Sequence, residues 1–211
     1  METVWIIGAG KFGRLAAKRL RKNYHILIVD NDESSLRSME ALNLPLVRND
    51  GVKYLVDNLK QGVDVSWIIP AVPIHLAWEW SRRKIGQTRL KPKEPPDNIL
   101  SFLPHPIRGK SSHIYTSHAD FICPDNCNEP DLLCTYTEKS RKQDMDQLLE
   151  SLSFEAFEPL VLKSRQLAPG VGGYRPDDLY NLLDRINQLR GSLLICTACR
   201  CHGVVNGAIH L

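Results

Sequence analysis

The chain has 211 residues and a formal net charge of +3, and 43% of its residues are hydrophobic. This length suffices for one sizeable domain or two small ones, and the charge is too small to indicate a nucleic-acid-binding protein. The longest apolar stretch, residues 65–78, contains Pro70 and Pro73 and is too short to cross a bilayer, and the N-terminus does not have the pattern of a secretory signal. We therefore expect a cytoplasmic protein that neither inserts into a membrane nor binds nucleic acid.

The N-terminal segment follows the order strand, glycine-rich turn, helix, strand and acid. The apolar run 4–7 leads into a Gly-x-Gly-x-x-Gly turn formed by Gly8, Ala9, Gly10, Lys11, Phe12 and Gly13. A helical pattern follows, and a second apolar run at 25–29 ends on Asp30. This order is typical of a dinucleotide-binding site.

Each part of this segment suits one part of a dinucleotide. Gly8 permits the tight turn, Gly10 lets the backbone approach a pyrophosphate, and Gly13 lets the helix pack closely on the strand. The helix N-terminus offers free N–H groups and a partial positive charge to the phosphates. The Asp30 carboxylate can accept both ribose hydroxyls and would repel a 2′-phosphate, which favours NAD(H) over NADP(H). The alternative is a Rossmann-like fold that binds no nucleotide.

Strands and helices continue to alternate after Asp30. We expect a helix at 32–41, a strand at 44–47, a helix that carries Tyr54 and Leu55, a strand at 65–69 and a helix around Trp78. This alternation predicts a parallel sheet with helices on both faces. Ligands bind at the carboxyl ends of such strands, so Asn31 and Pro70 join the predicted cofactor-binding residues.

The composition changes after this unit. We divide the chain into a dinucleotide-binding half, a basic, proline-rich connector and a second α/β half, at 1–85, 86–98 and 99–211. In the second half we expect strands at 99–103, 159–163 and 192–195, and helices at 139–152 and from Pro176 onwards. If these strands continue the same sheet, both halves contribute to one ligand-binding edge. The expected fold is a Rossmann-like, doubly wound parallel α/β sheet with a loop-rich, cysteine-containing insertion in the second half.

The cysteines form two groups, and clustered thiols in a reducing compartment more often bind metal or do redox chemistry than form disulfides. Five of them are candidate metal ligands: Cys123, Cys127, Cys134, Cys199 and Cys201. Cys196 lies in an apolar run and is interpreted as a core residue. Thiolates suit zinc or an iron–sulfur cluster, and the spacing does not choose between them. A redox dithiol and plain buried thiols are the alternatives.

The glycine turn, with Asp30 and with Asp50 after the third strand, resembles the NAD-binding N-terminal domain of potassium-uptake regulators, the TrkA-N or RCK type. The resemblance covers roughly residues 3–85 and implies a regulatory nucleotide site, with Asp30 on the adenosine ribose and Asp50 near the adenine. It also implies a homodimer that acts on a membrane-transport partner protein. The family's usual Gly-Asp-Ala is here Asn49-Asp50-Gly51, and the second half has no counterpart in that family.

Three functions follow from these patterns. The first is an NAD(H)-binding sensor or regulatory subunit with a cysteine-ligated metal centre. The second is a small NAD-dependent oxidoreductase with substrate between Pro70–Pro73 and Gly170–Gly173, using His118 as acid/base or a thiolate at Cys199 or Cys201. The third is an interaction domain whose glycine turn is vestigial. The sequence favours the first and leaves open whether the protein is an enzyme.

Overall fold

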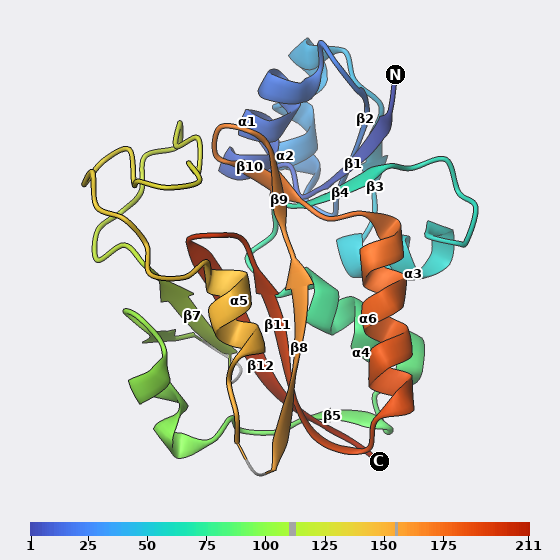
Figure 1. Ribbon diagram of the computed structural model, residues 1–211. Coiled ribbons are helices and arrows are strands. Elements are labelled where there is room, and N and C mark those ends of the chain that lie inside the picture. The colour runs from blue at the N-terminus through green and yellow to red at the C-terminus, as the bar shows by residue number, and fades with distance from the viewer. Residues whose placement is uncertain (110–112, 155) are drawn as a thin grey trace.

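The computed structural model describes residues 1–109, 113–154 and 156–211 (Figure 1). The described residues form two larger β-sheets and one two-stranded sheet. The first sheet, with α1 and α2 beside it, comes from the N-terminal part of the chain and lies at the top of Figure 1. The second sheet comes from the later part of the chain and lies below it. No described helix has both the length and the apolar character that crossing a membrane requires.

The first sheet is parallel, with the strand order β3-β2-β1-β4. Its elements, in chain order, are β1 (Thr3–Ile7), α1 (Lys11–Leu20), β2 (His25–Asp30), α2 (Glu33–Arg37), the 3-10 helix η1 (Glu40–Leu42), β3 (Leu46–Arg48), α3 (Gly51–Asn58), β4 (Trp67–Pro70) and α4 (Leu76–Ile85). The order confirms the predicted strand–helix alternation, with small shifts at the element ends.

Alternate residues of β1 face opposite sides of this sheet, as the pleat of a strand requires. Val4 and Ile6 pack with buried residues of α1 and α2. Trp5 and Ile7 pack in a second cluster with buried residues of α3 and α4. Helices therefore cover both faces, and the doubly wound parallel sheet that the sequence predicted is confirmed.

The second sheet is mixed and has the order β6-β7-β12-β11-β8, with β5 also paired to β12. Its strands are β5 (Leu90–Pro92), β6 (Ile107–Arg108), β7 (His113–Ser117), β8 (Phe157–Lys163), β11 (Gly191–Ala198) and β12 (His202–His210). β8 pairs in parallel with β11, whereas β12 pairs antiparallel with β11, β7 and β5. The expectation that the late strands continue the first sheet is therefore wrong. Antiparallel pairing with β12 gives these strands a sheet of their own.

The two sheets nevertheless share a hydrophobic core. Helix α6 (Pro176–Gln188) and α4 pack against each other and against the second sheet. Leu179, Leu182 and Trp80 of these helices belong to the same buried cluster as residues of β1, β8 and β11. On the other face of the second sheet, α5 (Met145–Glu150) packs with Ile99 of the 3-10 helix η2 (Asp97–Phe102).

A hairpin formed by β9 (Arg165–Ala168) and β10 (Val171–Gly173) connects the second sheet to the first. Tyr174, directly after it, exchanges two backbone hydrogen bonds with Ile68 of β4, at 2.9 and 3.1 Å. The hairpin also lies against α1, as the orange ribbon beside the blue helix in Figure 1 shows. The free edge of β4 is therefore paired with the residue that follows the hairpin.

Two further expectations are wrong. No strand forms at residues 99–103. Residues 99–102 lie in η2 and Leu103 is its C-cap, because the chain turns after Pro96 and buries Ile99. The helix expected at 139–152 is confined to Met145–Glu150. Its expected first turns remain in the loop between β7 and α5, residues 118–144, which we call the cysteine loop. There the Lys139 carbonyl accepts a hydrogen bond from the Cys134 N–H at 2.9 Å.

Candidate dinucleotide site and adjoining cysteine cavities

The glycine turn joins β1 to α1 and has the close contacts that its spacing predicts. Gly8 has φ of +111°, and a Cβ there would collide with the Ala71 carbonyl oxygen. A Cβ on Gly13 would collide with the Gly8 carbonyl oxygen, so α1 can approach β1 only with glycine at this position. At Gly10, by contrast, a Cβ would meet no heavy atom within 4 Å. The first and third glycines are required by packing, and the second faces open space.

The N-terminus of α1 can accept an anion. Gly10 is the N-cap residue and supplies no side chain for capping, and the first turn contains no acidic residue. Lys11 and Phe12 therefore present backbone N–H groups, together with the lysine charge, at the positive end of a ten-residue helix. This arrangement suits a phosphate.

Asp30 lies at the end of β2, beside this turn. One carboxylate oxygen accepts a hydrogen bond from Ala9 N at 2.6 Å, and the other accepts one from Asp32 N at 2.8 Å. The carboxylate thus holds the glycine turn in place, and each of its oxygens keeps a further acceptor lone pair for a ribose hydroxyl. Asn31 is exposed next to it. Asp32 is the N-cap of α2, and hydrogen bonds from Ser34 and Ser35 lower its pKa to about 2.

The two remaining candidates lie at neighbouring strand ends. Asp50 is the N-cap of α3, where its carboxylate accepts from Lys53 N at 2.7 Å and from Arg83 Nη1 at 2.9 Å. It therefore has a structural role that connects α3 to α4. Pro70 ends β4 in register with Ile7, which places the Pro70–Pro73 segment beside the glycine turn.

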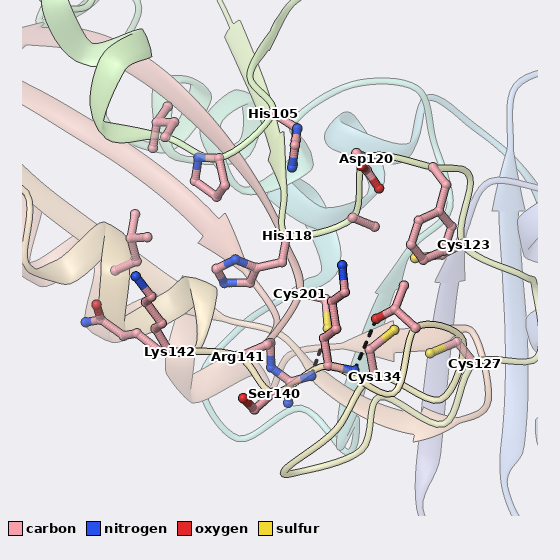
Figure 2. A pocket seen from close by; sticks show the side chains of 18 of the residues that line it. His105, His118, Asp120, Cys123, Cys127, Cys134, Ser140, Arg141, Lys142 and Cys201 are labelled. Carbon is pink, nitrogen blue, oxygen red and sulfur yellow. Dashed lines mark hydrogen bonds between the residues drawn. The ribbon is translucent and has the colours of Figure 1, made fainter.

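The five candidate cysteine ligands line two adjoining cavities, and Figure 2 shows the first of them. The first, of about 710 Å³, is lined by thiols of both groups: Cys123, Cys127, Cys134 and Cys201. The second, of about 450 Å³, is lined by Cys123, Cys127, Cys199, Cys201 and His202, and also by Lys11 and Phe12 of the glycine turn. The fold thus brings the candidate ligands to shared cavities, and the second cavity adjoins the glycine turn.

The local environments of these thiols differ. Hydrogen bonds from the Thr137 side chain and from the Thr137 and Tyr136 backbone lower the pKa of Cys134. Burial raises the pKa of Cys123 and of Cys199. Burial also raises the pKa of Cys201 to about 11, although the Arg141 charge acts in the opposite direction. Arg141 Nη1 lies 3.5 Å from the Cys201 sulfur. Without a bound cation, these three partly buried thiols remain neutral at pH 7.

Several sulfurs also accept hydrogen bonds from the backbone. The Glu129 N–H lies 3.4 Å from Cys127 Sγ, and the N–H groups of Cys201 and His202 stabilise a thiolate at Cys199. Among the described residues, no group of three or more His, Cys, Asp and Glu side chains has an arrangement that could hold a metal ion. Cys196 is fully buried in the core, as interpreted from the sequence.

The remaining candidates have clear positions. His118 lines the first cavity, and its backbone N–H donates to the Cys201 carbonyl at 2.9 Å. Burial lowers the pKa of the His118 ring. The Gly170–Gly173 segment contains the hairpin turn between β9 and β10. A Cβ on Gly170 would collide with the Asp125 carbonyl oxygen, and one on Gly173 would lie 2.6 Å from Ile69 Cδ1. Close packing therefore accounts for these two glycines without a ligand.

One buried polar group was missed by the sequence analysis. His75, directly before α4, has Nδ1 2.7 Å from Asn206 Oδ1 and Nε2 2.8 Å from Thr197 Oγ1. A neutral imidazole matches these partners with one donor and one acceptor. Burial lowers the His75 pKa to about 4. Its partners lie more than 120 positions away in the chain, so no local pattern reveals the contact.

Both parts of the chain match known families. Residues 4–56 match the TrkA-N domain, which confirms the resemblance carried by the glycine turn. Residues 76–210, from the start of α4 to the end of β12, match a family described as "Uncharacterized protein, C-terminal domain". The chain belongs to this family.

Similarity to a relative extends over both parts. An "Uncharacterized protein" of Archaeoglobus fulgidus is 32% identical over 217 aligned residues, which cover 95% of this chain and 96% of the relative. The aligned region therefore spans both family matches of this chain. No solved structure matches the chain.

Proposed function

We propose that this chain is a regulatory protein that binds NAD(H) at the glycine turn. The observation that carries the proposal is the open N-terminus of α1, where Gly10 leaves space for a pyrophosphate and no acidic residue of the first turn opposes it. The TrkA-N match supports a dinucleotide as the ligand. Asp30 at the end of β2 is the residue that would select NAD(H) over NADP(H).

The regulatory reading is supported by the chemistry near the Pro70–Pro73 segment, where the nicotinamide would lie. An oxidoreductase of this type needs a proton donor or acceptor there. His75 is the titratable group that follows this segment, but it is buried, both ring nitrogens have partners, and its pKa is about 4. A sensor needs no such group. As in potassium-uptake regulators, the protein would act as a homodimer on a membrane-transport partner.

The alternative is a small NAD-dependent oxidoreductase. The second cavity supports it, because this cavity lies between the glycine turn and the hairpin residues Gly170 and Gly172 and can hold a small substrate. Incubating the protein with NADH and candidate carbonyl substrates, and following absorbance at the nicotinamide band, separates the two. Turnover would favour the enzyme, whereas binding without turnover and a dimer in light scattering would favour the sensor.

We further propose that the cysteines hold zinc or an iron–sulfur cluster. The shared walls of the two cavities support this, since thiols from both sequence groups face them. Backbone N–H groups directed at Cys127, Cys134 and Cys199 would stabilise bound thiolates. Loading would release protons from the neutral thiols and draw the cysteine loop towards the turn between β11 and β12. Anaerobic purification followed by iron, zinc and sulfide analysis tests the proposal, and protein without metal would contradict it.

A further inference from the structure

The segment 123–127, which has a cysteine at each end, lies directly on the first helix of the dinucleotide site. Asp125 Oδ2 is 2.9 Å from Nζ of Lys11, the first residue of α1. From the same helix, Arg19 Nη1 donates to the Asp125 carbonyl at 2.6 Å and also to the Pro169 carbonyl. The lysine that would face a pyrophosphate is therefore already paired with a carboxylate from the cysteine loop.

The same segment is fixed to the β9–β10 hairpin. The Cys127 carbonyl accepts from Gly170 N at 3.0 Å and from Gln166 Nε2 at 2.9 Å. The hairpin approaches so closely that a Cβ on Gly170 would collide with the Asp125 carbonyl oxygen. Because both ends of the segment carry thiols that line the cavities, its position decides where Cys123 and Cys127 lie.

A pyrophosphate at the N-terminus of α1 and the Asp125 carboxylate carry charge of the same sign and would share one cation. We propose that Asp125 competes with the phosphate for the Lys11 ammonium group. Dinucleotide binding and docking of the cysteine loop then oppose each other. Binding of NAD(H) then loosens the segment 123–127 and exposes its thiols. By thermodynamic reciprocity, docking of the segment weakens NAD(H) binding by the same factor by which bound NAD(H) weakens docking.

The docking contact can be tested without any ligand. In metal-stripped protein, the alkylation rates of Cys123 and Cys127 with iodoacetamide, followed by peptide mass spectrometry, report the opening of the segment. We expect Asp125→Asn to raise both rates about two- to fivefold, the effect of losing one partly exposed ion pair. Asp120→Asn, at an exposed acid of the same loop, is the matched control and should leave them unchanged. Equal rates in the wild type and Asp125→Asn would overturn the docking role.

The coupling itself rests on the proposed NAD(H) binding and is tested by titration with NADH. We expect Asp125→Asn to bind NADH about fivefold more tightly than the wild type, the size expected for two like charges about 4 Å apart in water. NADH should also accelerate alkylation in the wild type, and much less in Asp125→Asn. Normal NADH binding with no affinity change and no acceleration would overturn the coupling while leaving the proposed function intact. Absence of NADH binding in folded wild type would contradict both, and the ligand-free alkylation rates would still decide the docking role.

Discussion

Replacing His75 with glutamine should remove a specific part of the acid sensitivity of this fold. The folded protein holds the ring neutral, with a pKa of about 4, whereas the unfolded chain has the ordinary value near 6.5. Because the unfolded state binds more protons, the free energy of unfolding falls as the pH drops from about 6.5 towards 4. The loss is complete only below the folded pKa.

The two pKa values set the size of this effect. Between pH 7.5 and pH 5, this one histidine should cost the wild type roughly 2 kcal/mol of unfolding free energy. His75→Gln keeps a polar side chain beside Asn206 and Thr197 but has no proton to gain. Its stability should therefore depend less on pH by that amount, whatever its absolute stability.

Urea unfolding of both proteins at pH 7.5 and pH 5, followed by circular dichroism, measures this difference. His118 and His202, whose pKa values burial also lowers, contribute equally to both proteins and cancel in the comparison. If the wild type and His75→Gln lose the same unfolding free energy between the two pH values, the assignment of a buried neutral His75 is wrong.

Two pairs of variants and one single variant test the site directly. Gly13→Ala should destabilise the fold by about 3 kcal/mol or more, because a Cβ would collide with the Gly8 carbonyl oxygen. Gly10→Ala should have the melting temperature of the wild type and lose NADH affinity. Equal melting temperatures for the two variants would refute these different roles. Cys127→Ser and Cys199→Ser should each lose the bound metal measured by elemental analysis, and loss from only one of them would refute a shared centre. Asp30→Ala should weaken NADH binding and narrow the preference over NADPH, and an unchanged preference would remove Asp30 from cofactor selection.

The N-terminal sheet could be predicted because its signals are local. Each strand reads as a short apolar run, and the glycine turn and Asp30 fall at positions that the strand–helix alternation dictates. The roles of Gly8 and Gly13 also follow from the turn itself, since their neighbours are close in sequence or on the adjacent strand end.

The second sheet could not be predicted to the same extent, because long-range pairing determines it. β12 was missed since Gly203, Asn206 and Gly207 interrupt its apolar pattern. Gly207 is there because the backbone of Lys93 passes so closely that a Cβ would collide with its carbonyl oxygen. The docking of Asp125 on Lys11 joins residues more than a hundred positions apart, and no pattern in either segment indicates it. The cysteine groups could be seen in the sequence, but their position beside the glycine turn depends on the β9–β10 hairpin.

Calorimetric titration of the wild-type protein with NADH and with NADPH tests the central claim most directly, with Gly10→Ala as the folded control. We predict saturable binding of NADH, at least about tenfold weaker binding of NADPH because of the Asp30 carboxylate, and no binding by the control. Absence of NADH binding to the wild type, or equal affinity for both dinucleotides, would contradict the account.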